Sequence, residues 1–218
     1  MDNKIQKNIK EILSVAFLIL FPHFFPLPFY SYTIICFLFI WIVLKKGGIA
    51  FNSLGFSKKN LTIHALTIGF VSAFLWGCFM QFLYIPVIKN LSTVPNYTEY
   101  NFIRNNFSTL IMTLIAAWLV GGLYEEIVFR GFIQNLLEKG LFKAYKVCWS
   151  IVVTSILFGL YHWQQDIFGV IAALLGGLYW GILYRIFGKN LWIPILSHAI
   201  FDTITLILIY YGLFGNLP

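Results

Sequence analysis

The chain has 218 residues, of which 60% are hydrophobic and only 11% are charged. Because a soluble domain is about 25% charged, this composition excludes an ordinary soluble domain and indicates an integral membrane protein with several spans. The net charge of +7 does not indicate nucleic-acid binding, since the lysines form short clusters between apolar runs. The cysteines lie in or beside apolar runs and form neither a disulfide framework nor a C-x-x-C site.

Seven apolar runs predict transmembrane helices, with eight as the alternative count. The first follows a lysine-containing start and lacks the small-residue cleavage pattern of a signal peptide, so we predict that it is retained and that Pro22, Pro26 and Pro28 break it. The predicted spans are residues 12–25, 30–44, 61–88, 107–137, 147–163, 167–187 and 191–214. We therefore predict an all-α, polytopic membrane helix bundle that forms one domain over residues 1–218.

The basic residues predict the orientation of this bundle. If the N-terminus is cytoplasmic, twelve of the fifteen lysines and arginines fall in cytoplasmic segments. Of the others, Lys89 and Arg104 lie in outside segments and Arg130 lies within a span. Cytoplasmic loops carry this excess in membrane proteins. We predict a cytoplasmic N-terminus, and the composition and small size suit a bacterial inner-membrane protein.

The stretch Gly121–Phe132 places three charged residues inside an apolar span. Each charge exposed to lipid there costs about 2.5–3.5 kcal/mol on insertion scales. Glu126 and Arg130 are four residues apart, so they share one face of an α-helix and can pair. Glu125 lies about 100° around the helix, which leaves its carboxylate to face another group.

Two later spans contribute further ionisable residues at the same spacing of four. Phe158 and His162 form one pair, and His198 and Asp202 form the other. A carboxylate and an imidazole can polarise a water molecule, and a second histidine can bind an oxyanion or a metal. No serine or cysteine is paired with these histidines in the sequence, so the pattern favours a water-activating hydrolase. Each histidine alone is more often a packing or helix-end residue.

Two other histidines stand outside this pattern. His23 lies among the prolines and is predicted to be interfacial. His64 lies near the start of a span and is predicted to be a helix-end residue rather than a ligand.

The three motifs together resemble those of the CPBP intramembrane proteases, also called the CAAX amino-terminal protease or Abi family. The resemblance covers about residues 110–210 and places a protease-like core at residues 107–214. It implies that Glu126 and Arg130 hold the fourth span in place. The motifs are Glu125-Glu126-x-x-x-Arg130, Phe158-x-x-x-His162 and His198-x-x-x-Asp202.

The same resemblance implies hydrolysis of a peptide bond. Glu125 and His162 would activate the water, and His198 and Asp202 would stabilise the oxyanion or complete a metal site. All four are of the types that bind zinc or a similar divalent ion, and a metal-free glutamate mechanism is the alternative. Some members have Asn at the last position. An ionised Asp202 cannot donate a hydrogen bond to an oxyanion, which favours a metal ligand or a residue that orients His198.

The expected partners are the lipid bilayer and a peptide or protein substrate, and no nucleic acid. Eukaryotic relatives cleave prenylated CAAX tails, whereas bacterial relatives are linked to peptide maturation and to self-immunity against bacteriocins. The sequence leaves prenylated and unmodified substrates open.

A non-catalytic immunity protein that binds a peptide is the main alternative, and it would not need an ionised Glu125. A proton- or ion-coupled transporter also uses intramembrane acids and histidines, but the sequence shows no inverted repeat or paired broken helices.

Overall fold

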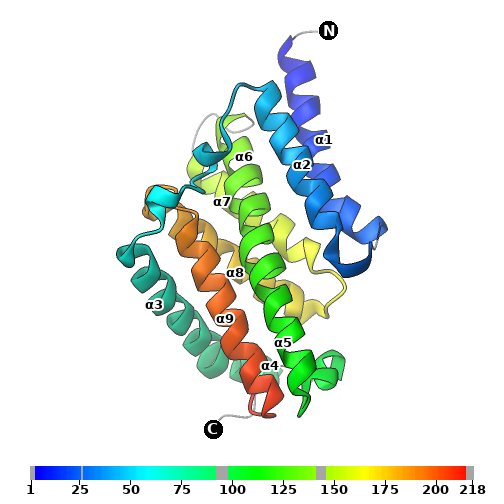
Figure 1. The fold of residues 1–218 in the computed structure, drawn as a ribbon, viewed down its shortest axis with the longest axis vertical. Helices are drawn as coiled ribbons and strands as arrows, with labels where there is room; N and C mark the ends of the chain where they lie inside the picture. Colours follow the sequence, from blue (N-terminus) through cyan, green and yellow to red (C-terminus); the bar gives the residue numbers. More distant parts are fainter. Residues whose placement is uncertain (1–2, 26, 92–97, 141–145, 215–218) are drawn as a thin grey trace.

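The computed structural model describes residues 3–25, 27–91, 98–140 and 146–214, and every regular element in them is a helix (Figure 1). The predicted all-α membrane bundle is thereby confirmed. The α-helices are α1 (Asn3–Phe24), α2 (Tyr32–Lys46), α3 (Ile63–Phe79), α4 (Ile85–Leu91), α5 (Phe107–Ala116), α6 (Asn135–Lys139), α7 (Lys146–Tyr161), α8 (Ile167–Ile186) and α9 (Trp192–Tyr210). The π-helical segments are η4 (Met80–Tyr84), η6 (Ala117–Glu125) and η7 (Ile127–Gln134).

Among the described residues, four continuous helices are long and apolar enough to cross a membrane, namely Ile63–Asn90, Phe107–Lys139, Ile167–Ile186 and Trp192–Tyr210. They match the third, fourth, sixth and seventh predicted spans closely. A fifth is reached if the pair Tyr32–Lys46 and Phe51–Asn60, bent by 107°, counts as one span. Helices α2 and α7 have only 15 and 16 residues, shorter than the roughly 20 that a bilayer requires. The count of seven therefore stays a prediction.

The first helix continues through a proline that was expected to break it. Helix α1 includes Pro22 and ends at Phe24, so the prediction that Pro22 breaks the helix is wrong. A proline removes one backbone hydrogen bond, and only two helical residues follow this one. His23 lies in the last turn and packs its ring 4.7 Å from the ring of Tyr161 on α7.

Small residues allow the helices around the centre of the bundle to approach closely. A Cβ on Gly177 of α8 would lie 2.9 Å from the Cα of Ser155 on α7. A Cβ on Gly122 of η6 would lie 2.7 Å from the Cβ of Ala199 on α9. Close approach at small residues is how membrane helices gain packing energy, and here it brings α8 against α7 and η6 against α9.

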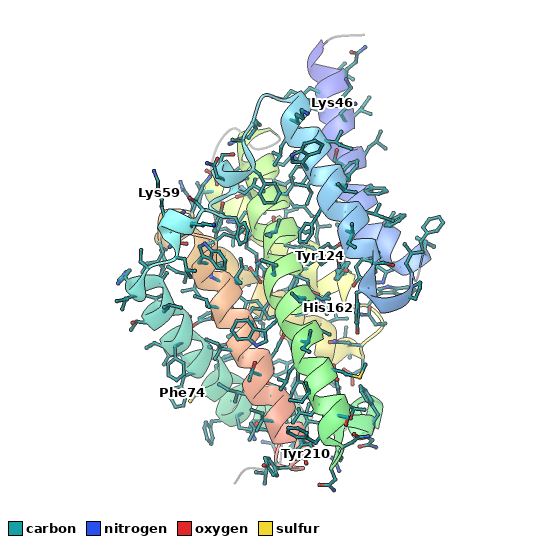
Figure 2. The ribbon with its side chains drawn as sticks, viewed as in Figure 1. Lys46, Lys59, Phe74, Tyr124, His162 and Tyr210 are labelled. Atoms are coloured by element: carbon teal, nitrogen blue, oxygen red, sulfur yellow. The ribbon has the colours of Figure 1, made fainter. Side chains whose placement is uncertain are left out.

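The bundle has two chemically different ends. The lysine-rich end contains the connections at residues 47–62 and 187–191 together with α6. There the Tyr184 hydroxyl donates to the Leu54 carbonyl at 2.8 Å, and Trp192 Nε1 donates to the Ser57 carbonyl at 2.9 Å. The far end contains η5 (Thr98–Ile103), the connection between α7 and α8, and the C-terminal end of α9. Figure 2 shows Lys46 and Lys59 at the upper, lysine-rich end and Tyr210 at the lower, far end.

Candidate active site

The acidic motif lies in a π-helical stretch formed by η6 and η7. In a π-helix each N–H bonds to the carbonyl five residues earlier, and such turns are frequent at functional sites. The α-helical repeat of 100° per residue assumed from the sequence is therefore wrong for this stretch. The spacing of four between Glu126 and Arg130 could not distinguish a π-helix from an α-helix, because residues four apart share a face in either type of helix.

Glu126 joins its own helix to α9 through a fully buried carboxylate. Its Oε1 lies 3.0 Å from Arg130 Nη1, and the side chains of both residues are 0% exposed. The same oxygen lies 2.9 Å from His198 Nδ1 on α9. Glu126 therefore contacts both a cation on its own helix and a histidine 72 residues later in the chain.

Glu125 turns to the other side and faces α7. Its Oε1 lies 3.9 Å from His162 Nε2, which is too long for a direct hydrogen bond but suits a shared water. The other nitrogen of the ring, Nδ1, lies 2.8 Å from the Phe158 carbonyl. A carbonyl only accepts hydrogen bonds, so Nδ1 carries the proton and Nε2 of the neutral ring presents a lone pair toward Glu125.

The fourth predicted residue, Asp202, lies beside His198. Asp202 Oδ2 is 3.7 Å from His198 Nε2, and a quarter of the Asp202 side chain is exposed. His198 is thus held between two carboxylates, Glu126 on one ring nitrogen and Asp202 near the other. The structure brings all the predicted site residues together, and Figure 2 shows His162 at mid-height in the bundle.

These side chains form the floor of an open cleft of about 420 Å³. Glu125, His162, His198 and Asp202 all line it. The remaining walls of the cleft are largely apolar and aromatic, and they come from α3, α5, α8 and α9. A mostly apolar cleft with a few convergent polar groups is typical of a ligand-binding or active site.

Residues 107–204 match the family model described as type II CAAX prenyl endopeptidase Rce1-like. These residues belong to the Rce1-like family. The match includes all three motifs, so the family suggested by the motif resemblance is confirmed. No curated protein and no solved structure matches the chain significantly.

The segment before the Rce1-like match also packs against the site. The rings of Tyr32 and Phe37 on α2 lie 5.7 and 5.5 Å from that of Tyr124, the residue before Glu125. The indole of Trp163, which follows His162, donates to His23 Nδ1 at 3.3 Å. Helices α1 and α2 therefore cover the side of the Rce1-like domain on which Glu125 and His162 meet.

Two aromatic residues surround the central charges of the Rce1-like domain. The Arg130 guanidinium carbon lies 4.3 Å from the centre of the Phe158 ring and 5.5 Å from that of Trp180. Trp180 also stacks on the His198 ring, with centres 3.8 Å apart and planes 17° apart. Such contacts stabilise a desolvated cation. Trp180 was not predicted as a site residue, because an aromatic residue in an apolar run resembles ordinary lipid-facing or core sequence.

Gly121 leaves the space that Asp202 occupies. A Cβ on Gly121 would lie 2.6 Å from Asp202 Oδ2 and 3.9 Å from His198 Nε2. We expect Gly121→Ala to displace the Asp202 carboxylate while the helix still forms, since alanine favours helix. A displacement of about 1 Å in an active site can cost on the order of 10²-fold in rate, so the expected loss of activity is between roughly 10-fold and 100-fold.

The matched control is Gly77→Ala on α3, where an added Cβ meets no atom within 4 Å. Both variants should accumulate in the membrane like the parent. Equal activity of the two variants would show that the space beside Asp202 is not needed.

The same four side chains, Glu125, His162, His198 and Asp202, are candidate ligands for a metal ion. The residue types fit zinc, and the Nε2 atoms of both histidines face the cleft. Within the described part of the chain, however, no three His, Cys, Asp or Glu side chains lie close enough together to hold an ion. The arrangement does not form a metal centre as it stands, so the chemistry below is derived from the side chains alone.

Proposed function

We propose that this protein is an intramembrane endopeptidase that hydrolyses a peptide bond with a water molecule activated by Glu125 and His162. The observation that carries the proposal is the facing pair of Glu125 Oε1 and His162 Nε2, 3.9 Å apart at the floor of the cleft. Membership of the Rce1-like family, whose printed description is an endopeptidase, supports the same reaction.

The two acceptors orient the water. One water proton is donated to the Glu125 carboxylate and the other to the lone pair of His162 Nε2, which leaves an oxygen lone pair free to attack. As the water oxygen bonds to the carbonyl carbon of the substrate, Glu125 takes up the proton. Glu125 then gives this proton to the nitrogen of the leaving amine while the C–N bond breaks. General acid–base transfer of this kind contributes about 10²–10⁴-fold to a rate.

His198 is proposed to stabilise the oxyanion that forms during attack. With both ring nitrogens protonated, it donates Nδ1–H to Glu126 and directs Nε2–H into the cleft beside Asp202. Preorganised donors of this kind are worth about 10²–10³-fold in rate each. Asp202 orients the ring, and Trp180 fixes its plane by stacking. Glu126 and Arg130 act as a positioning pair rather than as reacting groups.

A divalent ion remains the other proposal for the same residues. Glu125, His162, His198 and Asp202 would be its ligands if the side chains move closer together, and it would supply an activated water. A strong chelator should abolish cleavage if the mechanism requires the ion and should leave cleavage unchanged if it does not. An assay with and without chelator therefore distinguishes the two proposals.

The substrate is proposed to be a peptide or protein segment, with or without a prenyl group, at a cellular membrane. We propose that the protein lies in a bacterial inner membrane, which its composition and small size suit. We also propose that its N-terminus is cytoplasmic, which the distribution of lysines supports. A processing or immunity role toward bacteriocin-like peptides is the finer proposal that suits such a location.

Cleavage by the purified, reconstituted protein tests the proposed reaction. A panel of prenylated and unmodified peptides should yield cleavage by the parent, and His162→Ala should reduce it by about 10²-fold, as expected for loss of a group that orients the attacking water. The control is His64→Ala at the start of α3, a histidine that does not line the cleft. Similar activity of both variants would contradict the role of His162.

A non-catalytic binding protein is the alternative function. It would hold a peptide in the same cleft and would not require the proton transfers described above. A cellular phenotype that survives Glu125→Gln, together with unchanged peptide binding and no cleavage by the parent, would favour this alternative.

A further inference from the structure

We infer that the active-site cleft opens to the extracytoplasmic side of the membrane, so that its substrate is a peptide segment reached from that side. The part concerning the substrate rests on the proposed peptidase function. The side of the membrane to which the cleft opens does not depend on that function, because it is inferred from the positions of the cleft and of the basic residues.

The cleft opens toward the far end of the bundle. Residues at that end that line it are Tyr84, Tyr100, Gln165, Asp166 and Phe214. They come from four separate segments that surround the mouth. Among the described residues, none from the connections at the lysine-rich end contributes to the lining.

Contacts within the far end join these segments in two groups, and both groups line the same cleft. The Tyr84 hydroxyl donates to the Phe168 carbonyl at the start of α8. Ile103 of η5, Leu110 of α5 and Leu206 of α9 form a small buried cluster of their own. The mouth is therefore bounded by elements that meet at one end of the bundle.

The basic residues gather at the opposite end. The far-end segments contain only Lys89 and Arg104, and Arg130 lies at the centre. By sequence, all the other lysines and arginines belong to the N-terminal segment and to the lysine-rich end, namely Lys4, Lys7, Lys10, Lys45, Lys46, Lys58, Lys59, Lys139, Lys143, Lys146, Arg185 and Lys189. Such an excess in short segments next to the spans marks the cytoplasmic side.

The side chains around the mouth suit an interface between lipid and water. Tyr84 and Tyr100 line the mouth, and the exposed Tyr211 follows α9 at the same end. Tyrosines concentrate at the level of lipid headgroups. A peptide with apolar side chains could thus pass from the outer surface into the aromatic cleft and reach Glu125. A cytosolic prenylated tail would meet the closed, lysine-rich end instead.

Labelling of single cysteines tests the side on which the cleft opens. In a full-length chain whose Cys36, Cys78 and Cys148 are replaced by alanine, Gln165→Cys places a thiol at the mouth and Lys59→Cys places one at the lysine-rich end. We expect a membrane-impermeant maleimide to label Gln165→Cys in intact cells and to label Lys59→Cys only after permeabilisation. The reverse pattern would overturn the inference.

A reporter fused after Phe214 provides a second measurement if either thiol fails to react. Alkaline phosphatase, which is active only after export, should be active at this position, and green fluorescent protein should not fluoresce. Fluorescence with an inactive phosphatase would overturn the inference.

Cleavage in proteoliposomes of known orientation then tests the substrate side. Peptides supplied on the face that carries the mouth should be cleaved, and those confined to the lysine-rich face should not. Cleavage only at the lysine-rich face would overturn the inference. An outward-facing cleft with no cleavage at either face would reject the proposed peptidase function while the orientation stands.

Discussion

Replacement of Glu125 by glutamine should reduce peptide cleavage by at least about 10²-fold, the scale of a lost general acid–base group, and leave the protein in the membrane. Glutamine has nearly the same shape and can still hydrogen-bond, but it cannot accept the water proton. Glu125 is only 7% exposed, and removal of its charge at that depth relieves desolvation rather than adding to it. The measurement is the rate of peptide cleavage by reconstituted protein, normalised to the amount of folded protein.

Glu138→Gln is the matched control for this experiment. Glu138 is a similarly buried carboxylate at the lysine-rich end, where it contacts Lys189 Nζ at 3.2 Å and does not line the cleft. We expect this variant to retain cleavage even if its thermal stability falls slightly. Full activity of Glu125→Gln, or equal losses in the two variants, would remove Glu125 from the proposed mechanism.

Replacement of Arg130 by alanine should have the largest effect on stability. The variant leaves the Glu126 carboxylate in the interior without its cation, and removal of one partner of a buried pair costs about 3–5 kcal/mol. It also removes the guanidinium that lies against Phe158 and Trp180 and its hydrogen bond to the Gly177 carbonyl. Membrane accumulation and the melting temperature in detergent should both fall.

Two further variants separate the charge effect from simple loss of packing. Arg185→Ala removes a partly exposed cation near Glu138 and should change stability by about 1 kcal/mol or less. The double variant Glu126→Gln/Arg130→Ala should recover part of the lost stability, because no charge is left stranded, but not activity, because His198 loses its carboxylate partner. A double variant that is less stable than Arg130→Ala would show that packing dominates.

The pairs of site residues within one helix could be predicted from the sequence. The contacts between site residues on different helices could not. The spacing of four in each motif places Glu126 with Arg130 and His198 with Asp202, because residues on one helix have fixed relative positions. The contact between Glu126 and His198 depends on how two helices far apart in the chain pack together. Spacing within a helix carries no information about that packing.

The sequence also predicted some features of the fold and missed others. The long apolar runs predicted the boundaries of four membrane-capable helices closely, since hydropathy alone determines them. The π-helical geometry around Glu125 and the role of Trp180 were missed, because neither has a distinct signal in an apolar sequence. The passage of α1 through Pro22 was missed because proline usually interrupts a helix, and the sequence does not show that α1 ends two residues after it.

The contact of Glu126 with Arg130 on its own helix has a consequence for biosynthesis. The two charges lie on one segment and can enter the bilayer together as a neutral unit, before α8 and α9 have been synthesised. His198 and Asp202 arrive only with α9, the last helix to leave the ribosome among those described. A nascent chain that lacks α9 therefore inserts without His198 and Asp202, and under the proposed mechanism it gains cleavage activity only when its own synthesis is nearly complete.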